Sequence, residues 1–223
     1  MVRIALAFSI SLVLLLFVIS LIYTAITSAN PPTTRRIIAN LSTGIEVFRA
    51  DWGMYPPSSA AQGGAMQYGC ANLAYYLLGP NGRGWGRDAQ TTGPFGGEVN
   101  GQFGPYYGVQ DAGLDPTCVL DADKPPRPIL YFRYDPDRNP PFDVRDNPVD
   151  ATGQKGYASQ AHLEQVIKIP LEGRSIWVRQ DYILVSSGWD RVYGWAVKDN
   201  TSGQMRPAMP DEPGASYDDI GNW

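Results

Sequence analysis

The sequence predicts an α+β fold in which a long N-terminal membrane and stalk helix precedes a small antiparallel sheet with enlarged loops. Three observations support this prediction. Residues 4–26 form an apolar run without charge, residues 37–52 have an amphipathic helical period, and short β-type runs fill the last part of the chain. Helices followed by a run of strands are typical of α+β domains. We therefore expect an anchor at 1–30, a stalk at 31–56 and a globular head at 57–223.

The apolar run has the length of a membrane-spanning helix. About 20 apolar residues cross the hydrocarbon core of a bilayer, and the Ser and Thr residues within 4–26 can bond back to helix carbonyls. The alternative is a secretory signal peptide cleaved near Thr27-Ser28-Ala29. Signal cores have about 7–15 residues, which is shorter than this run, so we favour the anchor.

The stalk segment predicts an α-helix with one apolar face. Its apolar residues recur every three or four positions at Ile37, Leu41, Ile45, Phe48 and Trp52. The pattern ends where Gly53 and then Pro56-Pro57 follow, because glycine caps helices and proline does not continue them. We expect the apolar face to pack under the head.

The head divides into a loop-rich part at 57–127 and a sheet part at 128–223. A short helix is expected at 71–78, where Gly79-Pro80 ends it. The β-type runs that follow have short linkers and no long helix between them, which indicates an antiparallel sheet. These runs are 129–132, 165–169, 175–178, 182–185 and 192–196.

Composition argues against several classes of function. The net charge is −4, which does not fit the basic surface of a nucleic-acid-binding protein, and we expect no nucleic-acid partner. His162 is the one histidine, and the sequence has neither a Gly-x-Ser-x-Gly nor a phosphate-loop motif. We therefore expect a protein that is not an enzyme.

The two cysteines, Cys70 and Cys118, both lie in the head. In an oxidising compartment such a pair most often forms a disulfide, and two buried free thiols are the alternative. Closing a loop of about 50 residues stabilises a fold by roughly 3–4 kcal/mol in the chain-entropy model. We favour the disulfide, which places the head outside the cytoplasm.

Three segments of the sequence form one joint pattern. The first is 41–56, which ends in Asp-x-Gly-x-Tyr-Pro. The second is 182–190, a strand followed by Ser-x-Gly-x-Asp. The third and most specific is 218–223, the C-terminal Asp-Asp-Ile-Gly-Asn-Trp. Together these segments resemble the major pseudopilin of type II secretion systems, a member of the type IV pilin-like family. The resemblance implies a pilin-like fold.

The resemblance also implies a structural calcium ion. Matched residue by residue, Asp190, Asp218 and Asp219 supply carboxylates, and Ser187 and Val192 supply carbonyl oxygens. Calcium takes 6–8 oxygen ligands, and three carboxylates gathered without a cation repel one another. The alternative is three solvated acidic side chains in loops.

The function that the resemblance implies is that of a structural subunit of a type II secretion pseudopilus or a type IV pilus-like filament. Its partners are then further copies in a helical filament, other pilin-like subunits and the membrane. It implies a single-pass protein of the bacterial inner membrane, with the head in the periplasm or outside the cell. The alternative is a monomeric, membrane-tethered, extracytoplasmic binding module whose loops 57–127 hold a carbohydrate or peptide. The absence of a Gly before the apolar run and of a Glu within it favours this alternative.

Overall fold

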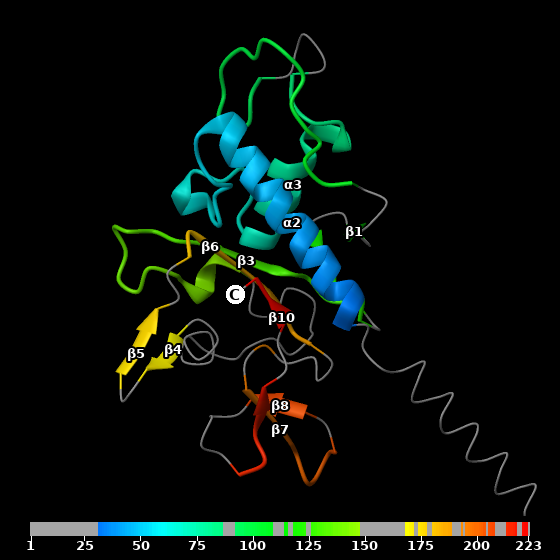
Figure 1. Cartoon of the computed structure of the whole chain (residues 1–223), viewed down its shortest axis with the longest axis vertical. Coiled ribbons are helices and arrows are strands. Elements are labelled where there is room, and N and C mark those ends of the chain that lie inside the picture. The colour runs from blue at the N-terminus through cyan, green and yellow to red at the C-terminus, as the bar shows by residue number, and fades with distance from the viewer. Residues whose placement is uncertain are drawn as a thin grey trace, which may run out of the picture.

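The structure is a computed structural model of the 223-residue chain. It contains two α-helices and several short antiparallel strands among its described residues (Figure 1). The described residues are 31–222 except 87–91, 109–113, 116–117, 124–125, 148–167, 172–173, 178–179, 189–192, 194, 204, 208–212 and 218–219.

Helix α2 (Pro31–Trp52) has the amphipathic character that the sequence predicted. Its apolar face is buried against the head and consists of Ile37, Ile38, Leu41, Ile45 and Phe48. The opposite face is exposed and carries charged side chains such as Arg35 and Glu46. The helix ends where Gly53, at φ 75°, donates its N–H to the Arg49 carbonyl at 2.8 Å. Glycine adopts this left-handed conformation without steric cost.

The predicted long N-terminal membrane and stalk helix is corrected by the structure. Helix α2 begins at Pro31 and has 22 residues, and the longest described helix is too polar to cross a membrane. The physical reason is that one face of the helix is exposed and carries Arg35, Arg36, Glu46 and Arg49, while the apolar side chains lie on the buried face. The segment predicted as an anchor, 1–30, lies outside the described residues. The predicted single-pass inner-membrane location is corrected by the same finding.

Helix α3 (Gly69–Leu78) lies beside α2 and is almost entirely buried. It begins two residues before the predicted position and ends at Gly79, as the sequence predicted. Cys70 at its start forms a disulfide with Cys118, and the two Cα atoms are 5.0 Å apart. Three 3-10 turns complete the helical structure among the described residues, at Ala60–Gln62 (η1), Pro80–Gly82 (η2) and Val144–Asp146 (η4).

The central sheet has three antiparallel strands in the order β10-β6-β3: β10 (Ile220–Gly221), β6 (Tyr182–Ser186) and β3 (Leu130–Arg133). Its register pairs Leu130 with Val185 and Arg133 with Tyr182, and it pairs Ile220 with Ser186. Helix α2 crosses this sheet in Figure 1, and all five side chains of β6 are buried.

The remaining strands form separate small sheets rather than one continuous sheet. The first is a β1–β2 pair, the second a β4–β5 hairpin, and the third has three strands in the order β8-β7-β9. Their bounds are β1 (Leu114–Asp115), β2 (Cys118–Val119), β4 (Lys168–Leu171), β5 (Arg174–Trp177), β7 (Trp195–Lys198), β8 (Met205–Pro207) and β9 (Ser216–Tyr217). Each predicted β-type run overlaps one of the strands, so the strand positions were predicted better than their grouping.

The core lies between the two helices and the central sheet. Leu41 and Ile45 of α2, Leu77 of α3, and Tyr131 and Leu184 of the sheet are all 0% exposed. Burying a large apolar side chain contributes about 1.5–3 kcal/mol. This layer fixes the position of α2 over the start of β6, which is where the candidate site lies.

Candidate functional site

The three segments that carry the family resemblance meet at one place in the fold. Tyr55 follows the end of α2, Tyr182 begins β6, and Asn222 follows β10. The rings of Tyr55 and Tyr182 have centroids 5.3 Å apart. The Asn222 side-chain oxygen accepts the Leu184 N–H at 2.9 Å. Residues that are more than 120 positions apart in the chain therefore form one local structure.

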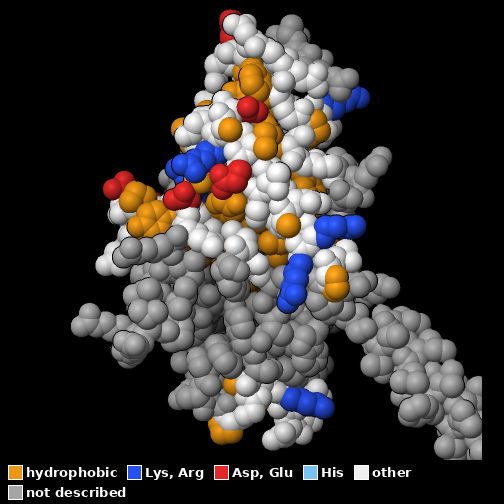
Figure 2. Space-filling view, in the orientation of Figure 1, with side chains coloured by type: hydrophobic (Ala, Val, Ile, Leu, Met, Phe, Trp, Pro, Cys, Tyr) orange, Lys and Arg blue, Asp and Glu red, His pale blue; other side chains and the backbone are white. Residues whose placement is uncertain are grey.

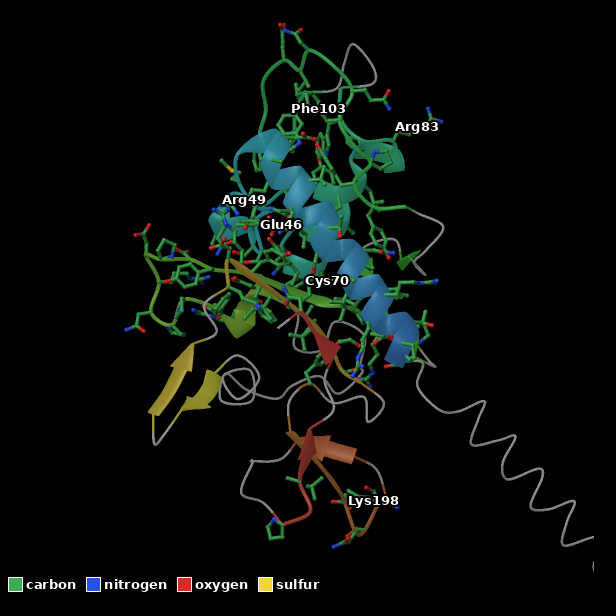
Figure 3. The ribbon with its side chains drawn as sticks, viewed as in Figure 1. Glu46, Arg49, Cys70, Arg83, Phe103 and Lys198 are labelled. Carbon is green, nitrogen blue, oxygen red and sulfur yellow. A yellow bond between two sulfur atoms is a disulfide. The ribbon has the colours of Figure 1, made fainter. Side chains whose placement is uncertain are left out.

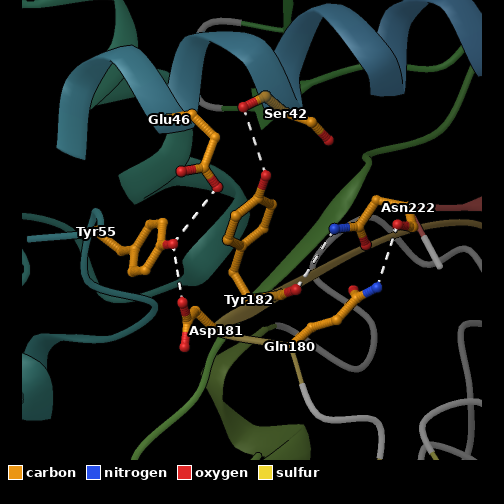
Figure 4. A pocket seen from close by; sticks show the side chains of 7 residues that line it. All are labelled: Ser42, Glu46, Tyr55, Gln180, Asp181, Tyr182 and Asn222. Atoms are coloured by element: carbon orange, nitrogen blue, oxygen red, sulfur yellow. Dashed lines mark hydrogen bonds between the residues drawn. The ribbon is translucent and has the colours of Figure 1, made fainter. Parts of the chain in front are cut away.

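A polar hollow of about 350 Å³ lies at this meeting point (Figure 4). Helix α2 forms one wall, the start of β6 forms the floor, and the C-terminal segment closes one side. We call it the polar hollow. Its lining consists of Ser42, Glu46, Tyr55, Gln180, Asp181, Tyr182 and Asn222.

Two carboxylates and one guanidinium surround the Tyr55 hydroxyl at the rim. This hydroxyl donates to Asp181 Oδ2 at 2.9 Å, lies 3.4 Å from Glu46 Oε1, and accepts a hydrogen bond from Arg49 Nη1. The Arg49 guanidinium carbon also lies 4.6 Å from the centre of the Tyr55 ring. Burial, and then the bond to Asp181, raise the Tyr55 pKa well above its usual value. Tyr55 is therefore a neutral hydrogen-bond donor at physiological pH.

Two oxygen atoms in the lining have no hydrogen-bond partner among the described residues. These are Ser42 Oγ and Gln180 Oε1, and both atoms are buried. A buried polar atom without a partner costs about 1–3 kcal/mol. The Tyr182 hydroxyl donates to the Ser42 carbonyl at 3.4 Å. Because both unpartnered atoms are buried, the acceptors that the hollow presents to a ligand are the carboxylates of Glu46 and Asp181, whose side chains are 52% and 61% exposed.

The predicted calcium ligands fall mostly outside the described residues. Asp190, Val192, Asp218 and Asp219 belong to that part of the chain, and Ser187 alone is described. Among the described residues, no group of three or more His, Cys, Asp or Glu side chains is arranged to hold a metal ion.

The described flank of the predicted calcium site is compatible with a buried ion. Ser187 is fully buried, and its Oγ has no hydrogen-bond partner among the described residues. The residue before it, Ser186, pairs with Ile220, so the described ends of both ligand-bearing segments lie together. Ser186 Oγ also donates to Asp121 Oδ2 at 2.8 Å, and burial raises the pKa of Asp121.

Among the described residues between 57 and 127, the aromatic side chains pack mainly against one another and against α2. Trp85 is 2% exposed, and its Nε1 donates to the Tyr76 carbonyl at 3.0 Å. The Phe103 ring packs on Trp52 at the end of α2, with centroids 5.0 Å apart (Figure 3 labels Phe103). Phe95 is the most exposed aromatic of this part of the described chain, at 40%, yet its ring stacks on Tyr76.

Sequence reasoning did not identify the polar hollow as a site. Its lining residues other than Gln180 and Asp181 lie within the segments already singled out, but these two carried no signal of their own. The available signal was on α2, where Glu46 and Arg49 lie three residues apart on the exposed face, a spacing at which helix side chains meet. Nothing in the sequence placed Asp181 next to that pair.

Comparison with known proteins adds no identification. No family model matches the chain, and neither a curated protein nor a solved structure shows significant similarity to it.

Proposed function

We propose that this chain is a structural, non-catalytic subunit of a pilus-like filament of the type II secretion pseudopilus or type IV pilus kind. The observation that carries this proposal is the convergence of the three family-like segments. The end of α2, the start of β6 and the C-terminal residues contact one another through Tyr55, Tyr182 and Asn222. Segments that resemble one family separately and also pack together are more informative than any one of them alone.

The packing of α2 supports a role in assembly. One face of the helix is held by the head, and the other remains exposed along its length. Val47 is 47% exposed on this outer face and borders a shallow, mainly apolar depression with Thr43 and Ala50. A helix with one buried and one open face can join its own head to a neighbouring subunit. Contacts of this kind that do not close into a ring produce a filament.

Calcium is part of the proposal. The ligands are the carboxylates of Asp190, Asp218 and Asp219 with carbonyl oxygens of Ser187 and Val192. The support from the described residues is the buried end of β6 at Ser187, next to the pairing of β6 with β10. When bound, calcium supplies a positive charge that holds the C-terminal segment to the strand end.

Electron microscopy of the purified full chain tests the assembly proposal. We expect filaments whose formation increases with protein concentration. Sedimentation velocity on the same samples measures the oligomeric state. A chain that stays monomeric at every concentration contradicts the proposal and favours the binding module instead.

The thermal midpoint of the full chain, with calcium and then with excess chelator, tests the metal site. With the disulfide intact, calcium at about one hundred times its Kd stabilises by about 2.7 kcal/mol, which raises the midpoint by about 5–10 °C. Asp190→Asn and Asp218→Asn should remove this rise. The exposed turn residue Asp137 provides the matched control, and Asp137→Asn should leave the rise unchanged. An equal midpoint with and without calcium contradicts the metal site but not the filament.

A further inference from the structure

Helix α2 carries opposite charges at two places on its exposed face. Arg35 and Arg36 lie near its start, are exposed, and form no ion pair with any described residue. Glu46 lies three turns further along, and Asp181 lies beside it at the rim of the polar hollow. Figure 2 shows the two regions apart, with basic side chains over the start of α2 and acidic and basic side chains mixed further along. Figure 3 labels Glu46 and Arg49 in the second region.

The two regions cannot satisfy each other within one chain. Arg35 and Glu46 are eleven residues apart and therefore lie on the same stripe of the helix. At 1.5 Å per residue their backbones are separated by about 16 Å along the axis. An ion pair requires the charged atoms to approach within about 4 Å. The arginines of one chain can meet these carboxylates only on another chain.

We propose that the polar hollow binds the Arg35–Arg36 segment of a second copy of this chain. This inference rests on the proposed filament function and names the contact that joins its heads. A guanidinium has five N–H donors and no acceptor. The hollow offers the complementary acceptors, namely the exposed carboxylates of Glu46 and Asp181.

Arg49 leaves these carboxylates with capacity for a second cation. Its Nη1 is 3.8 Å from Glu46 Oε2 and 3.7 Å from Asp181 Oδ2, which is longer than a hydrogen bond. Two carboxylates and one guanidinium also leave one net negative charge. Arg49 is held in place by Tyr55, to which it donates and over which it lies. The rim is therefore a preformed acidic site with one position filled by its own chain.

Other occupants fit the hollow less well. An anion is repelled by the two carboxylates, and an apolar group would cover these charged groups without pairing them. A calcium ion requires 6–8 oxygen ligands, and it meets the Arg49 guanidinium beside both carboxylates. A guanidinium from a partner carries half the charge of a calcium ion, so Arg49 repels it less, and its N–H groups donate in several directions.

The proposed contact is heterologous, because the arginine segment and the hollow are different surfaces of the same chain. Each copy that places its arginines in a neighbour still presents its own open hollow. Repetition of such a contact builds a filament unless the rotation closes a ring. Val47, exposed next to the hollow, adds an apolar contribution on the same face.

A charge-swap experiment on the full chain tests this inference. One variant carries Arg35→Glu and Arg36→Glu, and the other carries Glu46→Lys and Asp181→Lys. Each variant alone should associate at least about tenfold more weakly than the unmodified chain, as expected for losing close interfacial charge pairs. An equal mixture should regain association, because each altered surface then meets its complement on the other variant. Sedimentation velocity and electron microscopy measure both effects.

Two controls separate charge at this contact from charge in general and from misfolding. Arg83→Glu with Lys198→Glu makes the same change of net charge as the arginine variant, at exposed positions elsewhere, and association should stay as in the unmodified chain. If the lysine variant is unfolded by circular dichroism, the milder pair Glu46→Gln and Asp181→Asn takes its place. This pair should weaken association in the same direction.

The outcomes distinguish this inference from the function on which it rests. Filaments that persist in both charge variants overturn the inference and leave the filament proposal in place. Variants that each lose association but do not recover on mixing also overturn it, since the two surfaces then do not meet. An unmodified chain that stays monomeric overturns both.

Discussion

Replacing Asn222 by alanine should loosen the C-terminal segment by removing one specific hydrogen bond. Asn222 Oδ1 accepts the N–H of Leu184 at 2.9 Å, and Nδ2 reaches the Tyr182 carbonyl at 3.4 Å. The second contact is long and contributes little. Loss of the first bond leaves the main-chain N–H of Leu184, which is a fully buried residue, without its acceptor. An orphaned buried donor costs about 1–3 kcal/mol. Because this bond is only partly buried, water can partly replace the acceptor, and we expect about 1–2 kcal/mol.

Urea denaturation followed by tryptophan fluorescence measures this loss as a lower midpoint with an unchanged slope. Asn40→Ala is the matched control, because Asn40 is exposed on α2 and its loss should change stability by less than about 0.5 kcal/mol. An Asn222→Ala variant as stable as this control would refute the reasoning. The Asn222 side chain would then not hold the tail to β6.

Three further predictions follow from the described contacts. Gly44→Ala should destabilise the fold by about 1–2 kcal/mol, although alanine is the better helix former. The reason is that the alanine Cβ would lie 2.6 Å from the Tyr106 carbonyl oxygen. A variant that is more stable than the unmodified chain in urea denaturation would contradict this prediction. Reduction of the Cys70 disulfide should lower the free energy of unfolding by roughly 3–4 kcal/mol, and equal urea midpoints with and without reductant would show that the bond does not stabilise the fold. The hydrogen bond from Arg145 lowers the pKa of Asp143, so Asp143 stabilises the fold above its unfolded pKa of about 4 and loses that effect as the pH falls through the lowered value. Stability measured against pH should therefore fall less steeply in acid for Asp143→Asn, and identical acid limbs would contradict the assignment.

The local elements of this fold are predictable from the sequence because their signals are local. The apolar period of α2 and the capping Gly53 lie within about one turn of what they determine. Strands β3 to β7 follow from short β-type runs in the same way, whereas the other described strands, which have two or three residues each, carried no such run. The cysteine pair is a special case, since two cysteines allow only one intramolecular connection.

The arrangement of these elements depends on contacts between distant residues that no local pattern encodes. The sequence did not show that the strands of the described residues divide into four small sheets. It also did not show that Asp181 lies 2.9 Å from the Tyr55 hydroxyl. The predicted long N-terminal helix illustrates the opposite error. It joined an anchor at 1–30 to an amphipathic stalk at 31–56, whereas the described helix has only the residues Pro31–Trp52, and its exposed arginines at 35 and 36 make it a surface helix.

Stability and assembly should be linked in this protein through its C-terminal segment, which consists of β10 and Asn222. Strand β10 has only two residues, yet it covers the edge of β6, and an uncovered edge is a template for unwanted strand pairing. Asn222 extends this cover, because its Oδ1 accepts the Leu184 N–H of β6 at the point where the backbone pairing of the two strands ends. The same residue closes one side of the polar hollow. Loosening the tail must therefore change the hollow as well as the sheet edge. If the hollow receives the arginines of a second copy, Asn222→Ala should weaken association by more than Asn40→Ala does, under conditions where both variants remain folded.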